Sequence, residues 1–261
     1  MSDAIHRLLA VMQRLRDPEH GCPWDREQTW ASIVPHTLEE AYEVADAVRR
    51  DDPSAVRDEL GDLLFQVVFQ ARIAEERGLF DFDDVAASIA DKLERRHPHV
   101  FADEKIADAA EQSLAWERHK AAERAARGEE AGVLDGVTLG LPALTRAAKL
   151  GSRAARVGFD WTDAAGVREK VAEELAEFDA ARASGDLAHV HEEIGDLLFS
   201  LAQIARHLGI DAEGALRDAN AKFERRFRTM ERASARDGRS FDGRTMEELE
   251  ALWVAAKRDA G

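Results

Sequence analysis

The sequence contains one pattern of acidic residues twice, and this duplication limits the folds open to the chain. In each copy, two glutamates three residues apart are followed, after 15 residues, by a glutamate and an aspartate three residues apart, and all four acids reappear 134 positions later. Acids at this spacing share one face of a helix. The pattern therefore predicts two helical hairpins, each gathering four carboxylates. The acids are Glu40, Glu43, Glu59 and Asp62 in the first copy, and Glu174, Glu177, Glu193 and Asp196 in the second.

Four carboxylates in a small volume repel one another unless a cation neutralises them. At separations of about 5 Å and an effective dielectric of about 20, each like-charge pair costs on the order of 3 kcal/mol. Oxygen ligands without cysteine or histidine favour Mg²⁺, with Mn²⁺ as a substitute, and bound Mg²⁺ usually keeps positions for water and substrate phosphate. We therefore expect a Mg²⁺ site in each copy and a phosphate ester as substrate.

Composition narrows the class of partner. The 261 residues include 36 basic and 52 acidic side chains, a formal charge of −16, which argues against unaided binding to nucleic acid or to an anionic membrane. Cys22 is the sole cysteine, so intramolecular disulfides and a cysteine-based zinc site are excluded. The N-terminus lacks an apolar signal core, and no run approaches 18 apolar residues. We expect a soluble, cytoplasmic protein with a small-molecule partner.

Apolar residues recur at helical spacing along most of the chain, and strong helix formers dominate the composition. The expected fold is all-α, with two tandem domains of the four-helix-bundle type at residues 1–134 and 135–261. Their junction falls in the glycine-rich stretch 128–142. Helices are expected at residues 2–16, 37–49, 54–77, 82–95 and 109–127, and again at 141–156, 164–184, 187–208, 211–236 and 245–258.

The duplication extends beyond the acids. A GDLLF segment at 61–65 returns at 195–199, a KxxRR segment returns after 130 residues, and a tryptophan four residues before a lysine returns after 137. In each copy a metal site is thus followed by a basic segment that could bind phosphate and then by an aromatic ring. This combination of motifs suits the binding of a nucleotide. The substrate-binding candidates are Lys92, Arg95, Arg96, Trp116 and Lys120 in the first copy, and Lys222, Arg225, Arg226, Trp253 and Lys257 in the second.

These motifs also have purely structural interpretations. A basic segment can pair with the acidic surface, and Trp116 or Trp253 can be a core or interface residue. The histidines of the segments at 97–99 and 189–191 resemble metal ligands, but neither segment recurs in the other copy. We therefore do not expect these histidines to bind metal.

Further residues complete a resemblance to a known family. The duplicated acids, a CPWD segment at 22–25, the LERRHPHVF segment at 93–101 and the closing Trp253-x-x-x-Lys257 together resemble the MazG family of two-domain nucleoside triphosphate pyrophosphohydrolases, over essentially the full chain. The resemblance implies an all-α NTP pyrophosphatase fold that binds Mg²⁺ through the acids and cleaves a nucleoside triphosphate to the monophosphate and pyrophosphate. By analogy it also implies a homodimer.

Together the residues and the resemblance suggest a mechanism with broad base tolerance, suited to housekeeping of nucleotide pools. Mg²⁺ on the second acids would neutralise the triphosphate and activate a water for in-line attack, and Glu173 or Glu192 would orient that water or accept its proton. Lys222, Arg225 and Arg226 would neutralise the departing pyrophosphate. Trp253 and Lys257 would face the nucleoside or the phosphate tail, and the first-copy residues could act in the same way.

One difference favours the second copy as the active one. Lys170 lies one turn before Glu174, on the metal face of its helix, whereas His36 holds the equivalent position in the first copy. Lysine is a fixed charge near phosphate, whereas histidine is mostly neutral at pH 7. Two alternatives stay open: both copies work equally, or the first is only structural. A nucleotide- or alarmone-binding regulator without turnover is the competing function.

Overall fold

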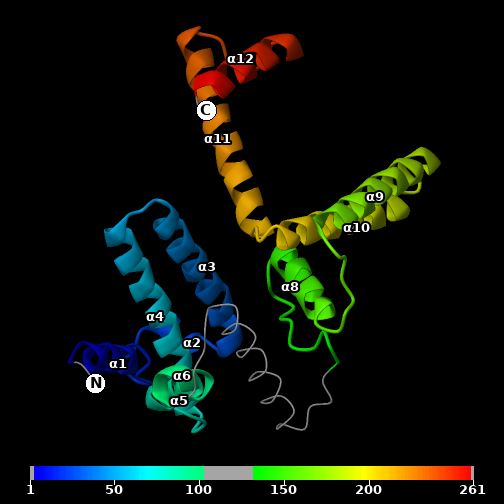
Figure 1. Cartoon of the computed structure of the whole chain (residues 1–261). Coiled ribbons are helices and arrows are strands. Elements are labelled where there is room, and N and C mark those ends of the chain that lie inside the picture. Colours follow the sequence, from blue (N-terminus) through cyan, green and yellow to red (C-terminus); the bar gives the residue numbers. More distant parts are fainter. Residues whose placement is uncertain (1–2, 103–131, 260–261) are drawn as a thin grey trace. The chain divides into compact units, whose positions relative to one another are not determined.

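The protein is described by a computed structural model that covers residues 3–102 and 132–259. Within these ranges the secondary structure is helical and no strand occurs, which confirms the all-α prediction for the described part. The chain divides into two compact units, residues 1–123 and 124–261 (Figure 1). The helix expected at 109–127, with Trp116 and Lys120, lies outside the described residues, and a domain junction at 134/135 remains our proposal.

In the first unit, α3 and α4 form a helical hairpin, and α1 and α5 pack against α4 (Figure 1). Met12, Ile33, Val68, Phe69 and Ile73 form its buried core. Burying such side chains contributes about 1.5–3 kcal/mol each, so this core is the main support of the hairpin. The helices are α1 (Asp3–Leu15), α2 (Pro23–Glu27), α3 (Trp30–Arg49), α4 (Pro53–Glu76), α5 (Phe82–Arg96) and α6 (Pro98–Phe101).

Capping residues set where these helices begin. A capping box between Thr29 and Ser32 starts α3, and the Asp52 side chain accepts hydrogen bonds from the first backbone N–H groups of α4. The expected start of α3 at residue 37 is wrong, because the capping box nucleates the helix earlier and Pro35 is accommodated inside it. The short helices α2 and α6 were not expected; each has a proline in its first turn.

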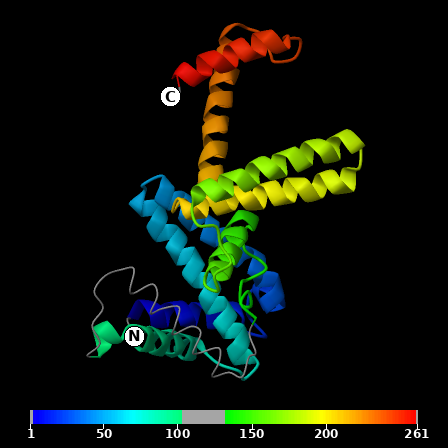
Figure 2. The same ribbon diagram turned by 45° about the vertical axis from the view of Figure 1, so that its right-hand side comes forward.

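In the second unit, α9 and α10 form the corresponding hairpin, with α8 packed on α10. Helix α11 packs against α8 and α10, and α12 packs on α11. Both views show α11 leaving the hairpin at a wide angle, with α12 at its far end (Figures 1 and 2). We call α11 and α12 the C-terminal arm. The helices are α8 (Ala143–Ala155), α9 (Ala164–Ser184), α10 (Leu187–His207), α11 (Ala212–Arg236) and α12 (Met246–Asp259).

The second core is partly polar. Gln203 stands at the position equivalent to Phe69 and is fully buried; its Nε2 donates to the carbonyl of Ala147 at 2.8 Å, and its Oε1 accepts from Arg206 Nε at 2.7 Å. Arg206 and His207 in turn bond to Asp160, and the Arg206 guanidinium is the main reason that the pKa of Asp160 is lowered to about 2. A hydrogen-bonded network thus ties α8 and α10 to the loop before α9.

None of the described helices is both long enough and apolar enough to cross a membrane.

Gly151 permits this network, and replacing it gives a test of the packing. A Cβ at position 151 would overlap the amide of Gln203, which cannot move away because both of its polar atoms are hydrogen-bonded. We expect Gly151→Ala to lower the free energy of unfolding by about 1–3 kcal/mol in urea denaturation. Gly195→Ala in α10 is the control, since open space surrounds its Cβ and alanine favours the helix. Equal effects of the two changes would contradict the packing argument.

Candidate metal centres

Each hairpin gathers three carboxylates at one point. In the first, Glu40 and Glu43 of α3 meet Glu59 of α4, and in the second, Glu174 and Glu177 of α9 meet Glu193 of α10. In each group one oxygen per residue lies within 4.8 Å of the others. Oxygens on opposite sides of an octahedral Mg²⁺ are about 4.2 Å apart, so small side-chain movements would let all three reach one ion. The donor set fits a hard divalent cation.

The fourth acid of each predicted set lies outside these groups. Asp62 and Asp196 are exposed, one turn beyond Glu59 and Glu193 on the same helices. Asp62 is still close enough for its charge to raise the pKa of Glu40. Each aspartate therefore lies at the edge of its group.

The first group is held together against its own repulsion. Burial raises the pKa of Glu40, and the charges of Asp62 and Glu43 raise it further. Burial and Glu43 likewise raise the pKa of Glu59, with Arg50 opposing the shift. Within the described ranges no ion pair of 4 Å or less reaches Glu40, Glu43 or Glu59. Among the described residues, the group therefore has no ion-pair partner.

The second group has two internal partners. Lys170 Nζ lies 2.8 Å from Glu174 and 2.7 Å from Glu173, and His189 Nε2 lies 2.9 Å from Glu193. Glu174 and Glu193 are only 5 % and 8 % exposed. Burial raises the pKa of Glu177, Lys170 opposes this, and Glu174 and Glu193 add to it. The hydrogen bonds to Glu173 and Glu174 raise the pKa of Lys170, which keeps it charged.

The two copies differ where the sequence suggested and at one further position. Lys170 does lie on the carboxylate face of α9, whereas His36 approaches Glu39, outside the first group, at 3.7 Å. His189, for which we expected no metal role, contacts Glu193, and Ala55 is its counterpart in the first copy. The i, i+4 spacing of His189 and Glu193 was the available signal for this contact.

In the second copy, the described basic residues form no ion pairs with the acids. Lys222, Arg225 and Arg226 lie on α11 and Lys257 on α12, and in the described part of the chain no ion pair links them to the second group. Trp253 packs against Phe223 with ring centroids 5.3 Å apart, and Lys257 Nζ lies 5.7 Å from the Trp253 ring centre. The basic segment and the aromatic candidate therefore share the C-terminal arm.

The remaining candidate residues lie outside the two carboxylate groups. Glu173 is bound by Lys170, and Glu192 is exposed and outside the carboxylate group. Lys92, Arg95 and Arg96 lie at the end of α5, where both arginines have interaction partners.

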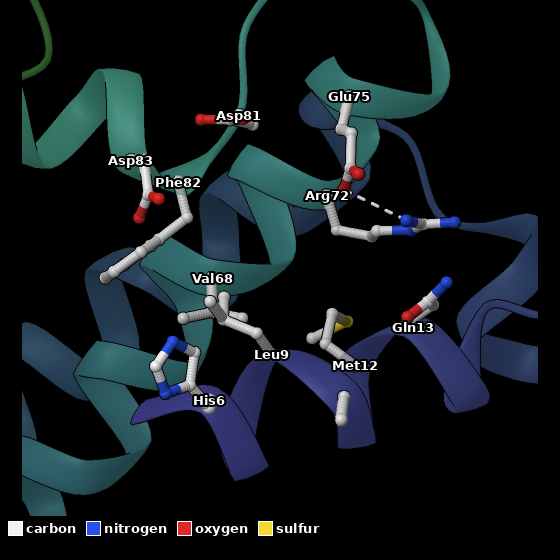
Figure 3. Close-up of a pocket in the computed structure, with 11 residues that line it drawn as sticks. His6, Leu9, Met12, Gln13, Val68, Arg72, Glu75, Asp81, Phe82 and Asp83 are labelled. Carbon is white, nitrogen blue, oxygen red and sulfur yellow. Dashed lines mark hydrogen bonds and ion pairs between the residues drawn. The ribbon is translucent and has the colours of Figure 1, made fainter. Parts of the chain in front are cut away.

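A pocket in the first unit is separate from the acids. It encloses about 280 Å³ between α1, α4 and the start of α5, and is lined by His6, Met12 and Phe82 among others (Figure 3). Arg72 at its edge is held by Glu75 at 2.9 Å and Glu76 at 3.0 Å. The pocket therefore offers no unpaired arginine for a phosphate group.

Repulsion among the first three carboxylates can be measured. Removing one charge should stabilise the metal-free protein, so we expect Glu43→Gln to raise the melting temperature in EDTA by about 2–4 °C. Added Mg²⁺ should stabilise the wild type more than this variant. Glu39→Gln, on the same helix but outside the group, is the control. A lower melting temperature for Glu43→Gln would show that repulsion is not the dominant effect.

Comparison with known proteins identifies the family of the chain. The family model described as "MazG nucleotide pyrophosphohydrolase domain" matches residues 28–101 and again residues 164–230, which confirms the tandem duplication. Each match contains one complete set of acids.

Relatives match over nearly the whole chain. A nucleoside triphosphate pyrophosphohydrolase of Escherichia coli is 54 % identical over 97 % of both chains. A protein of Thermotoga maritima named nucleoside triphosphate pyrophosphohydrolase/pyrophosphatase MazG is 41 % identical over 97 % of this chain and 95 % of its own. A solved MazG-related protein of that organism is 28 % identical and covers 44 % of this chain and 98 % of its own, with a TM-score of 0.38. The chain belongs to the MazG family of nucleotide pyrophosphohydrolases.

Proposed function

We propose that this protein is a Mg²⁺-dependent nucleoside triphosphate pyrophosphohydrolase, which converts NTPs and dNTPs to the monophosphate and pyrophosphate. The observation that carries the proposal is the second carboxylate group, whose three oxygens fit one divalent ion and whose neighbour Lys170 is a fixed cation. The names of the full-length relatives support the same reaction. The charge of −16 supports a small nucleotide rather than nucleic acid as the partner. The single cysteine, Cys22, suits a reducing compartment, and we place the protein in the cytoplasm.

In this proposal the residues of the second hairpin and of the C-terminal arm have separate roles. Glu174, Glu177 and Glu193 hold Mg²⁺, with Asp196 at the edge, and the ion supplies charge neutralisation and a water of lowered pKa. Glu173 or Glu192 orients the attacking water or accepts its proton. Lys170 faces the phosphates, and the arm residues Lys222, Arg225 and Arg226 neutralise the departing pyrophosphate. No side chain is assigned to a base edge, and stacking on Trp253 supports broad base tolerance.

The products and the metal dependence test the reaction. With ATP, dGTP and dUTP, ion-exchange chromatography should show monophosphate and pyrophosphate with Mg²⁺ and neither product in EDTA. Glu177→Gln should lower kcat roughly 100-fold or more, because a direct metal ligand is lost. Glu43→Gln should reduce turnover less, since the second copy is the proposed active one. Equal losses would refute the asymmetry, diphosphate plus phosphate would indicate another reaction, and binding without turnover would favour the regulator.

We also propose that the protein is a homodimer. The hairpin of the second unit exposes Leu175, Ile194 and Leu198 beside its acids, and the arm exposes Phe223 beside its basic residues. Arg226 adds a buried Nε without a hydrogen-bond partner. An acidic apolar surface and a basic apolar surface are complementary, so the arm of one copy can cover the hairpin of another and complete its site.

A mixture of two inactive variants tests this arrangement. If the arm acts on the partner's hairpin, co-expressed Glu177→Gln and Arg226→Ala chains form mixed dimers in which one of the two sites has all its residues. Random pairing should then restore roughly a quarter of wild-type activity. Mixed dimers isolated through two affinity tags should show about half of the wild-type activity. Activity no higher than that of either variant alone would show that arm and hairpin work within one chain.

A further inference from the structure

The two carboxylate groups consist of the same three residue types, but different side chains lie beside them. In the second, Lys170 and His189 each contact one of the two most buried carboxylates, Glu174 and Glu193. In the first, His36 and Ala55 hold the equivalent positions, and no ion pair within 4 Å reaches the three glutamates in the described ranges. The first copy therefore serves as an internal reference for the second.

These contacts compete with a metal ion. Lys170 Nζ lies 2.8 Å from Glu174 and His189 Nε2 lies 2.9 Å from Glu193, on two of the three carboxylates that a divalent ion would bind. Drawing Glu174 onto an ion separates it from Lys170, and a lysine that remains close to the ion is repelled by it. The metal therefore binds more weakly unless Lys170 gains another anionic partner.

A polyphosphate is such a partner. Lys170 also contacts Glu173 and is about one-third exposed, so its ammonium group can turn toward a ligand without unfolding the helix. A triphosphate bound to the same ion would bring several anionic oxygens within reach of Lys170. Metal and nucleotide would then each strengthen the binding of the other by the same factor.

We propose that Lys170, with His189 as a positioning residue, makes the second carboxylate group take its divalent ion together with a nucleotide, whereas the first group binds the ion alone. The proposal rests on the proposed function and adds an order of binding to it. Lys170 is the exchanging group, which moves from Glu174 to the phosphates. His189 Nε2 lies 2.9 Å from Glu193 and would restrain its carboxylate.

Mn²⁺ titrations of the full-length protein, followed by the EPR signal of free Mn²⁺, test this order. In a Glu43→Gln chain the titration measures Mn²⁺ binding by the second group, and in a Glu177→Gln chain it measures binding by the first. Each titration is done with and without an α,β-methylene nucleoside triphosphate, an analogue whose α,β bridge resists cleavage. The analogue should tighten Mn²⁺ binding at least 10-fold at the second group and less than threefold at the first. Without analogue, the first group should bind Mn²⁺ at least threefold more tightly than the second.

Substitutions of Lys170 and His189 distinguish the proposal from a merely structural role of these residues. In the Glu43→Gln chain, Lys170→Met should tighten Mn²⁺ binding without analogue at least threefold and reduce the coupling below threefold. His189→Leu should also tighten binding without analogue, and His189→Gln, which keeps a donor, should resemble the parent. Lys149→Met, an exposed lysine of α8, is the matched control and should change neither affinity nor coupling.

The reciprocal exchange keeps the test valid if Lys170→Met fails to fold. In the Glu177→Gln chain, His36→Lys should weaken Mn²⁺ binding without analogue and create coupling to it. Equal Mn²⁺ affinities of the two groups without analogue, unchanged by Lys170→Met and His36→Lys, would overturn the proposal. If the analogue fails to bind, the proposed function fails, but the titrations without analogue still decide whether Lys170 competes with metal. Coupling without pyrophosphate release would support the order of binding and refute the reaction.

Discussion

Mutual repulsion of carboxylates across a helical hairpin is the constraint on which both halves of this protein depend. The packing of α3 on α4 brings Glu40, Glu43 and Glu59 together, and burial, followed by the charges of neighbouring carboxylates, raises the pKa of Glu40 and Glu59. Apolar burial of Phe69 and its neighbours offsets the cost of this repulsion in the first unit. In the second unit, Lys170 and His189 instead lie one turn from the acids and contact Glu174 and Glu193.

Much of this arrangement follows from local sequence rules. The i, i+3 spacing of the acids and their repetition predicted the hairpins, and α9 has the bounds expected from its pattern because Asp163 caps its start and Gly185 its end. The expected start of α3 at residue 37 was too late, because the capping box of Thr29 and Ser32 begins the helix before Pro35. Local capping chemistry therefore sets the ends of both helices.

Other features depend on contacts that periodicity does not reveal. Gln203 occupies a position that is apolar in the first copy, and its burial depends on Gly151 and Ala147 being close by. The contact of His189 with Glu193 was present in the sequence as a spacing but was outweighed by the absence of a second histidine copy. The separation of the basic arm from the acids depends on the angle between α10 and α11, and no residue pattern encodes that angle.

The contrast between the two cores bears on how the chain folds. The first unit buries large side chains such as Met12, Ile33 and Phe69, so its collapse needs no other molecule. The second unit buries mainly small apolar residues and leaves Leu198, Phe199 and Phe223 partly or largely exposed. If a second copy covers them, the last step of folding for this half is bimolecular, and its rate rises with protein concentration. Dilution would then slow the maturation of the second half.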